Sequence, residues 1–355
     1  MTAHHVVALS SAESVAQRYE SYEEIFDPPS REELAWREGK SLRRQGTHRQ
    51  ALEGDGSPAL GAGVEGLEGG FRPTYRPSRF EEGWLLESLR AFYEEGLLRD
   101  VLALIKGGKE AHVYRCAAQP TTGLDLVAAK VYRPRMFRNL RNDALYRQGR
   151  QILTEDGTPV RKTDDRVLRA VGKKTAFGQQ VSHTSWLMHE FVTLRRLHQA
   201  GAAVPQPLGA SENAILMSYL GDERMAAPTL NTVTLSHAEA KRLFREVLRN
   251  VELMLKQGIV HGDLSAYNIL YWQGEILIID FPQVVDCLGN DQARDILRRD
   301  LARTCEYFAS QGVECDAEAL TGDLWGQYVG SMLREQLADL SMREYERGTE
   351  AIEEA

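Results

Sequence analysis

His261-Gly-Asp-Leu-Ser-Ala-Tyr-Asn-Ile-Leu270 is followed, beyond a short turn, by Ile278-Ile-Asp280. Between them, two runs of β-forming residues flank Gln273-Gly274, and a glycine-containing pair in that position predicts a hairpin turn. A hairpin brings residues that lie twelve apart in the chain back together. The sequence therefore predicts that Asn268 and Asp280 face the same point in space.

Three polar residues of this stretch have the spacing that phosphoryl transfer requires. Asp263 lies five residues before Asn268, and Asp280 follows the hairpin. In a kinase-type centre the first Asp acts on the attacking hydroxyl, while the Asn and the second Asp hold the metal ions that neutralise the nucleotide phosphates. H-x-D alone is frequent by chance, but its combination with the Asn, the hairpin and the second Asp is not. We predict Asp263 and Asp280 as catalytic residues, and Asn268 and Asp280 as metal ligands.

A glycine-rich turn upstream is a candidate phosphate-binding loop. The β-rich run Val101-Leu-Ala-Leu-Ile105 enters it, and a second strand leaves it. A loop of this kind can lie over phosphates with its backbone N–H groups directed at the charge, although a simple tight turn also explains two adjacent glycines. The nucleotide contacts predicted here are Gly107, Gly108, Lys109, Glu110, Ala111 and Val113.

A lysine and a glutamate in the next two elements form a candidate ion pair. Lys130 is the one charged residue in the apolar strand 126–132. Glu190 lies three residues after Leu187 in the predicted helix 185–201, so it falls on or beside the buried face. A carboxylate there needs a cation, and Lys130 is the obvious candidate. The alternatives are a solvent-facing lysine and a glutamate at the border of the helix face.

The order of these segments predicts an α+β, bilobal, protein-kinase-like fold. The strand 214–220 occupies the position of the hinge between two lobes, where Ser218 and Leu220 would present backbone groups to adenine. Ser236-His-Ala-Glu239 is a capping box, which predicts the start of a long helix in the second lobe.

The predicted domain boundaries follow from composition and periodicity. Residues 1–78, rich in glycine between 54 and 70, are predicted to form a flexible extension. A β-rich N-lobe with one helix is predicted for 79–220, including a basic insertion at about 133–182. A mainly helical C-lobe is predicted for 221–355.

These motifs resemble the RIO family of atypical serine/threonine protein kinases over about residues 101–308. Gly108-Lys-Glu-Ala-His-Val-Tyr114 is similar to the family's phosphate loop, and Asp263-Leu-Ser-Ala-Tyr-Asn268 to its catalytic loop. As in that family, no A-P-E motif follows Asp280, so the usual activation segment is missing. The phosphate loop is more like that of the family's first subfamily. Asp280-Phe-Pro-Gln283, in the metal loop, is more like the metal loop of the second subfamily. This combination suggests a bacterial-type member with mixed features.

The resemblance implies ATP-dependent phosphoryl transfer with Mg²⁺, or with Mn²⁺ in its place, to a protein substrate or to the chain itself. Some members form a phosphoaspartate on the metal-loop Asp, here Asp280, and behave as ATPases. Eukaryotic and archaeal members act in small-subunit ribosome maturation, which suggests a ribosomal partner. Two other functions stay open: a small-molecule phosphotransferase of the aminoglycoside-kinase type, and a nucleotide-binding scaffold associated with RNA.

The chain has a formal net charge of −8, but its charge is unevenly distributed. Residues 133–174 contain twelve Lys or Arg and five Asp or Glu, a formal charge of +7. This segment is either a solvated insertion or a docking site for a polyanion such as RNA or for an acidic protein partner. The second interpretation predicts that basic residues of the segment bind the partner without taking part in the chemistry; those chosen are Arg138, Arg141, Arg147 and Arg150.

Cysteine usage and hydropathy predict a cytoplasmic protein without membrane contact. The four cysteines have no metal-ligand spacing and are predicted to be reduced core residues. No apolar run approaches the roughly 20 residues of a membrane span, and the N-terminus lacks a signal-peptide layout.

Overall fold

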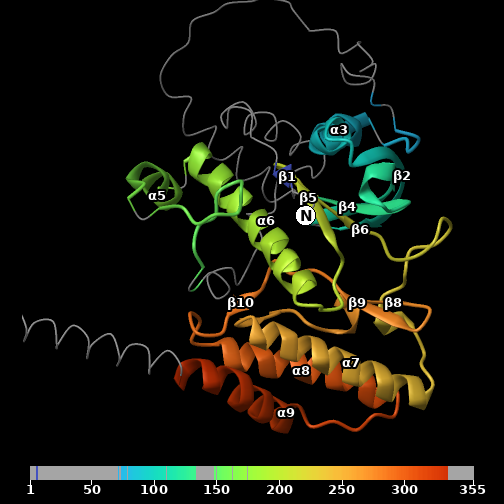
Figure 1. Cartoon of the computed structure of the whole chain (residues 1–355), viewed down its shortest axis with the longest axis vertical. Helices are drawn as coiled ribbons and strands as arrows, with labels where there is room; N and C mark the ends of the chain where they lie inside the picture. The colour runs from blue at the N-terminus through green and yellow to red at the C-terminus, as the bar shows by residue number, and fades with distance from the viewer. Residues whose placement is uncertain are drawn as a thin grey trace, which may run out of the picture.

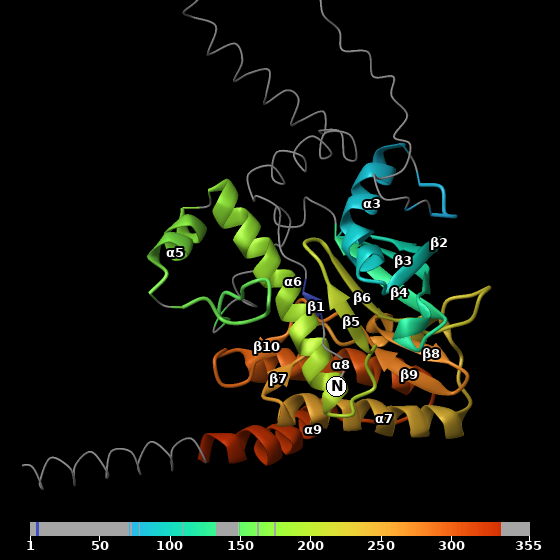
Figure 2. The same ribbon diagram turned by 45° about the horizontal axis from the view of Figure 1, so that its top comes forward.

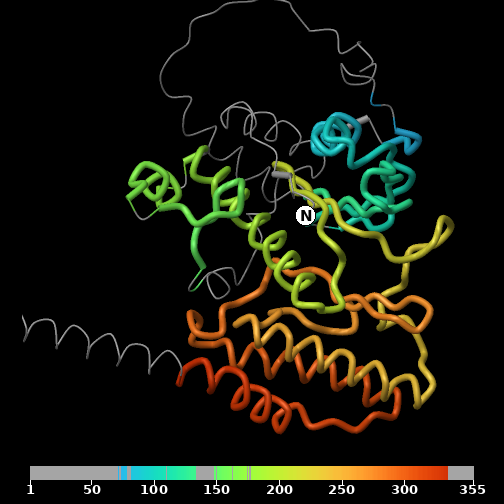
Figure 3. Tube along the Cα trace, viewed as in Figure 1, coloured from blue at the N-terminus to red at the C-terminus, as the bar shows by residue number. Residues whose placement is uncertain are grey.

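The computed structural model describes residues 5–6, 71, 73–77, 79–108, 110–132, 148, 150–161, 163–173 and 175–334. A β-sheet half and a helical half lie one above the other (Figure 1). The chain passes between them after the last strand of the large sheet, along the yellow part of the trace (Figure 3). The predicted bilobal α+β fold is confirmed.

Six strands form the sheet of the N-lobe, in the order β1-β5-β6-β4-β3-β2. β1 pairs in parallel with β5, and the other neighbours are antiparallel. The strands are β1 (His5–Val6), β2 (Leu98–Gly107), β3 (Ala111–Ala118), β4 (Leu126–Tyr132), β5 (Pro207–Ala210) and β6 (Ala214–Ser218), with a short 3₁₀ turn at Pro120–Thr122. β4, which carries Lys130, lies between β3 and β6, so its lysine is held on both sides by backbone ladders.

One face of this sheet packs against α3 (Arg79–Glu94), whose inward side chains include Leu85, Leu89 and Phe92. Phe71 is also buried there, and its ring stacks on Tyr93 with 4.6 Å between centroids. The ordered N-lobe therefore begins earlier than the predicted boundary at residue 79. Apart from β1, residue 71 and residues 73–77, the predicted extension lies outside the described residues.

The helix that carries Glu190 is longer than the sequence pattern predicts. α6 spans Ala176–Gln199, and the side chain of Thr175 caps its start by accepting from the Gly178 N–H at 3.1 Å. A shorter helix, α5 (Asp165–Gly172), precedes it and packs so closely that a Cβ on Gly178 would lie 2.0 Å from the Ala170 carbonyl oxygen. The predicted insertion at 133–182 therefore includes all of α5 and the first turns of α6 (Figure 2).

Within the described residues 221–334, the C-lobe contains the three α-helices α7, α8 and α9 together with short strands. The predicted hairpin is present, and Gln273 and Gly274 have φ values of 49° and 91°, as a type I′ turn requires. Ser236 caps the long helix, as predicted, by accepting from the Glu239 N–H at 3.3 Å. The elements are η3 (Leu230–Thr232), α7 (His237–Lys256), β7 (Ile259–Val260), η4 (Ala266–Asn268), β8 (Ile269–Trp272), β9 (Glu275–Ile278), β10 (Val285–Asp286), α8 (Ala293–Ser310), α9 (Ala317–Leu324) and the π-helical turn Trp325–Val329. Within the described ranges, no helix combines the length and the apolarity that crossing a bilayer needs.

Two of the four cysteines differ from the prediction. Cys305, near the end of α8, forms a disulfide with Cys315, and their Cα atoms are 5.8 Å apart. Cys116 and Cys287 are free and buried. The prediction of four reduced thiols is wrong for the first pair, because the turn between α8 and α9 brings together residues whose spacing in the sequence indicates no pairing.

Candidate active site

A cavity of about 620 Å³ lies between the N-lobe sheet and the β8–β9 hairpin. Its apolar walls include Val113, Ala128, Met217 and Leu270, contributed by four different strands. Its polar end consists of Lys130, Glu190, Asn268 and Asp280, and the other predicted site residues that line it are Gly108, Glu110, Ala111, Ser218 and Leu220. An apolar slot with a charged end suits a ligand that has a flat apolar part and an ionic part.

Lys130 connects two carboxylates at the charged end of this cavity. Its Nζ lies 2.7 Å from Glu190 Oε1 and 2.6 Å from Asp280 Oδ1. The Glu190 side chain is 1% exposed, and its second oxygen accepts from the Tyr132 hydroxyl. Burial alone lowers the pKa of Lys130, but the charges of Asp280 and Glu190 outweigh it and hold this pKa well above its ordinary value. The predicted Lys130–Glu190 ion pair is thus present, and Asp280 is added to it.

Asp280 has an unusual backbone conformation. Its φ is +73°, in the left-handed region that non-glycine residues rarely adopt. The preceding residue is held on both sides, because the Ile279 N–H donates to the Asn268 carbonyl at 2.9 Å and the Ile279 carbonyl faces His261 Nε2 at 3.1 Å. Burial raises the pKa of Asp280, but the charge of Lys130 outweighs it and lowers the pKa below its usual value. Asp280 is therefore ionised at the cavity's charged end.

Asp263 lies beside a second cavity rather than in the first. That cavity has a volume of about 710 Å³, and Asn268 lines both cavities. Asp263 Oδ1 accepts from Arg303 Nη1 at 2.8 Å, and Asp263 Oδ2 accepts from Asn268 Nδ2 at 3.2 Å. Both carboxylate oxygens are therefore held, one by a helix of the C-lobe and one by the catalytic loop itself.

His261 and Gly262 tie the catalytic loop to its surroundings. The Asp263 N–H donates to His261 Nδ1 at 3.2 Å, so Nε2 carries the proton that Ile279 accepts. Burial lowers the pKa of His261, which favours the neutral ring with its proton on Nε2. Gly262 has a φ of 87°, and a Cβ there would lie 2.1 Å from the Gln283 carbonyl oxygen. Only glycine fits at this position, where the catalytic loop and the metal loop cross.

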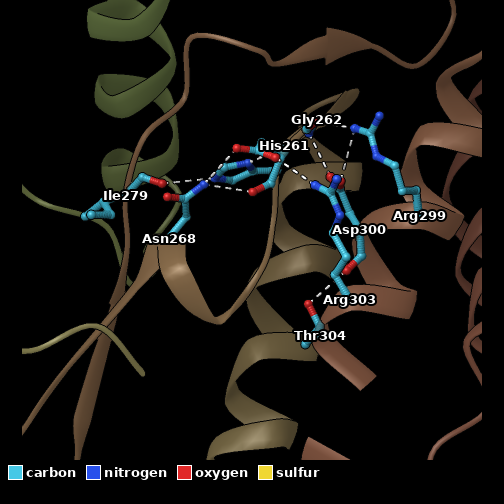
Figure 4. Close-up of polar contacts among 9 residues, drawn as sticks. His261, Gly262, Asn268, Ile279, Arg299, Asp300, Arg303 and Thr304 are labelled. Carbon is cyan, nitrogen blue, oxygen red and sulfur yellow. Dashed lines mark hydrogen bonds and ion pairs between the residues drawn. The ribbon is translucent and has the colours of Figure 1, made fainter. Parts of the chain in front are cut away.

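Helix α8 supplies a support for the catalytic loop that the sequence did not indicate. Asp300, 1% exposed, accepts from the Gly262 N–H at 2.8 Å, and Arg299 donates to the Gly262 carbonyl (Figure 4). Burial raises the pKa of Asp300 to about 7. In the sequence, Arg299, Asp300 and Arg303 have the spacing of an ordinary charged helix face. This spacing alone therefore did not indicate that they support the catalytic loop.

The hinge residues have some of their backbone groups already engaged. The Ser218 N–H donates to the Gln206 carbonyl at 2.8 Å, and the Leu220 carbonyl accepts from the Ala227 N–H at 3.0 Å. The other backbone group of each residue is the Ser218 carbonyl or the Leu220 N–H. These two groups are the candidates for contact with a base.

The glycine loop is described except for Lys109, which lies outside the described residues. Gly107 ends β2, pairs with His112 and does not line the cavity. A Cβ on Gly108 would lie 2.6 Å from the Ala111 carbonyl oxygen, so the turn is tight. Burial, and then the negative charge of Asp280, raises the pKa of Glu110. Lys106, which the sequence did not single out, also lines the cavity and helps to lower the pKa of Asp280.

Comparison with known proteins places this arrangement in a family. The RIO domain matches residues 145–320. The chain is 30% identical over 226 residues to the RIO-type serine/threonine-protein kinase Rio1 of Haloferax volcanii, covering 62% of this chain and 68% of the relative. This chain belongs to the RIO family of atypical serine/threonine protein kinases. Its fold is that of the family.

Two further relatives show how far the similarity extends. The serine/threonine-protein kinase RIO1 of Chaetomium thermophilum is 31% identical over 229 residues, which cover 61% of this chain and 41% of that protein. The RIO-type serine/threonine-protein kinase Rio1 of Thermoplasma acidophilum is 30% identical over 135 residues, covering 38% of this chain and 69% of the relative. The chain thus spans less than half of the fungal relative, whose remaining parts have no counterpart in the match.

Proposed function

We propose that this protein is a RIO-type kinase or ATPase that transfers the γ-phosphoryl group of ATP. The observation that carries this proposal is the Lys130 bridge between Glu190 and Asp280 at the charged end of a cavity with apolar walls. A cation fixed at this point can pair with nucleotide phosphates, and the strand and helix on either side hold it in place.

The volume and polarity of the cavity support ATP as the proposed ligand. The adenine ring would lie between Val113, Ala128 and Leu270, with its polar edge toward the Ser218 carbonyl and the Leu220 N–H. The phosphates would then reach Lys130 and the loop 107–111. Backbone N–H groups of the loop and the lysine charge would hold them in line for transfer.

Asn268 and Asp280 are the proposed ligands of Mg²⁺ or Mn²⁺. Both line the cavity, and an amide oxygen and a carboxylate are the hard donors that these ions prefer. Asn268 Nδ2 is bound to Asp263, which directs the amide oxygen away from Asp263. Within the described residues, no group of three His, Cys, Asp or Glu side chains forms a metal cage, so phosphates and water would complete the coordination. The ion would supply charge neutralisation to the phosphates.

Asp263 is the proposed base for the attacking group. Arg303 and Asn268 fix its two oxygens, and the carboxylate remains 38% exposed toward the second cavity. An acceptor hydroxyl or a water molecule entering there would meet Asp263 on one side and the phosphate end of the nucleotide cavity on the other, because Asn268 borders both. Asp263 would orient this group and take its proton.

The phosphoryl acceptor and the binding partner are proposed as chemical classes. A serine or threonine of a protein, or of this chain itself, is the proposed phosphoryl acceptor, and water is the acceptor in ATPase turnover. The basic segment 133–174 is proposed to dock a polyanion, with ribosomal RNA as the ligand to test. Residues 133–147 of this segment lie outside the described residues, so the proposal rests on their charge.

Incubation with γ-labelled ATP and Mg²⁺ tests the function, first with the purified protein alone and then with a cell extract. Label on protein, or labelled inorganic phosphate, is the expected result, and both should disappear in Asp280→Asn. Label on a small molecule would favour the aminoglycoside-kinase class. Absence of label transfer, hydrolysis and ATP binding together would contradict the proposal and leave the RNA-associated scaffold.

A further inference from the structure

Arg150 makes contacts that its expected role as a docking residue does not explain. Its Nη2 donates to the Pro282 carbonyl at 2.8 Å, and its Nε donates to the Val284 carbonyl at 3.1 Å. Nη2 also donates to the Val284 carbonyl. The guanidinium is partly buried against the four residues that follow Asp280. The prediction that Arg150 is a docking residue remote from the chemistry is therefore at odds with the structure.

The loop that Arg150 contacts needs external support. Asp280 enters it in the left-handed conformation, which costs free energy unless the surroundings hold it. Within the loop, the Val284 N–H reaches the Phe281 carbonyl only at 3.4 Å, a long hydrogen bond. Arg150 instead satisfies two carbonyls, those of Pro282 and Val284, with one rigid group.

The segment around Arg150 is itself fixed to both lobes. Gln148 Nε2 donates to Asp291 Oδ2 at 2.8 Å in the C-lobe. In the N-lobe half, the Gln151 carbonyl lies 2.7 Å from His189 Nε2, and the Leu153 N–H donates to Ser185 Oγ at 2.9 Å. His189 and Ser185 belong to α6, the helix that also carries Glu190.

Residues 150–153 therefore join α6 to the loop after Asp280. Glu190 on α6 and Asp280 at the start of that loop are the two carboxylates that hold Lys130. A displacement of Arg150 would leave the Glu190 side of this bridge in place and release the Asp280 side. The effect would fall first on the groups that hold the metal ion.

We propose that Arg150 is a positioning residue that holds the loop 281–284, so that Asp280 is presented to Lys130 and to the metal ion. The expected effect on turnover rests on the proposed function, whereas the expected effect on the mobility of the loop does not. Arginine reaches the Val284 carbonyl through Nε as well as Nη2, whereas a lysine has no donor at the Nε position and would lose that contact. Arg150→Lys should therefore restore only part of what Arg150→Ala loses.

The test compares Arg150→Ala and Arg150→Lys with a matched control in the same basic segment. Arg169→Ala removes an equal charge from α5, where the side chain is 73% exposed and contacts Asp165 of its own helix, with Nε 3.0 Å from the carbonyl and Nη2 4.0 Å from the carboxylate. Amide hydrogen exchange of residues 279–286 is measured on the metal-free, nucleotide-free protein. Mg²⁺ titrations of ATP hydrolysis then give the concentration for half-maximal activation and the kcat at saturating Mg²⁺.

Arg150→Ala should speed exchange in 281–286 and raise the half-activating Mg²⁺ concentration, each by about tenfold, the equivalent of one lost charge-assisted hydrogen bond. At saturating Mg²⁺ the kcat should recover to near wild type, Arg150→Lys should be intermediate, and Arg169→Ala should match wild type. Wild-type exchange and Mg²⁺ dependence in Arg150→Ala would overturn the inference. If Arg150→Ala fails to fold, Arg150→Lys decides, and wild-type behaviour there overturns it. A wild type that shows no label transfer, no ATP hydrolysis and no ATP binding would overturn the proposed function, while the exchange data would still decide whether Arg150 holds the loop.

Discussion

The two cavities of this protein meet at Asn268, yet they are built in different ways. The first takes its walls from the N-lobe strands, α6 and the β8–β9 hairpin, and almost every predicted site residue lines it. The second takes its walls from η3, η4 and α8; the residues that α8 contributes are Arg303, Glu306, Tyr307 and Ser310, none of which belongs to a recognisable motif. The first cavity, the proposed nucleotide side, is therefore lined mostly by residues of local motifs, whereas the second, the proposed acceptor side, combines the catalytic loop with α8 residues that no motif indicated.

The largest expected effect on turnover comes from replacing Asp263 or Asp280, the carboxylates that face the two cavities. Asp263→Asn and Asp280→Asn should each lower turnover by roughly 10³-fold, within the range for loss of a catalytic acid–base or charge-stabilising group. Asp263 lines the second cavity, so its loss should spare Mg·ATP affinity, while the loss of Asp280 should weaken it. Calorimetry with Mg·ATP measures both, and equal large losses of affinity would erase the distinction between the cavities.

Lys130→Ala should affect the nucleotide cavity and the fold together. The substitution leaves Glu190 buried without its cation, and breaking a buried pair in this way costs about 3–5 kcal/mol of stability. Turnover should fall by roughly 10²-fold because the phosphates lose their fixed charge. Urea unfolding and ATP titration check the two effects, with Lys241→Ala, an exposed lysine on α7, as the control. Unchanged ATP affinity in Lys130→Ala would remove this lysine from the site.

Arg303→Ala, unlike Lys130→Ala, should lower turnover without weakening ATP binding. Arg303 holds Asp263 Oδ1 from the second cavity and does not line the first. Its loss should lower kcat by about tenfold, the value of one charge-assisted hydrogen bond, and leave the KM for ATP unchanged. Steady-state kinetics separates the two parameters. A rise in the KM for ATP with unaltered kcat would show that the two cavities do not divide the reaction in this way.

Asp300, which holds the Gly262 N–H, should make the stability of the protein depend on pH. Its pKa is raised to about 7, so the folded protein binds this proton more tightly than the unfolded chain does. Its contribution to stability is complete below about pH 4 and is lost as pH rises toward 7, by up to about 4 kcal/mol. Urea unfolding from pH 4 to 8 should therefore show stability falling with pH more steeply in wild type than in Asp300→Asn. Parallel curves would indicate that Asp300 stays ionised.

The smallest expected effect on turnover lies outside both cavities. Replacing Arg138, Arg141 and Arg147 with Ser, and leaving Arg150 intact, should weaken binding of ribosomal RNA and keep basal ATP hydrolysis near wild type. Each lost phosphate contact should reduce the slope of log affinity against log salt by about 0.7–0.9. Titration across salt concentrations measures this slope. Absence of RNA binding by wild type at low salt would leave the solvated-insertion interpretation.

The sequence by itself determined the hairpin, the catalytic and metal loops and the Lys130–Glu190 pair. Each of these follows from local chemistry: a turn pair that needs positive φ, a charge that cannot stay alone on a buried face, and polar residues at fixed spacing. The family resemblance drew on the same short motifs. Nothing beyond residue type and spacing was needed for them.

Only the tertiary structure decided which surface charges take part in the site. Arg303, Asp300 and Arg150 act on residues 38 to 134 positions away, and the disulfide joins the end of α8 to the turn beyond it. A charged residue on an exposed helix face or in a basic loop has the same sequence signature whether or not it has a partner. Its role depends on which backbone carbonyl or carboxylate the packing of the two lobes brings within about 3 Å, the distance at which a hydrogen bond forms.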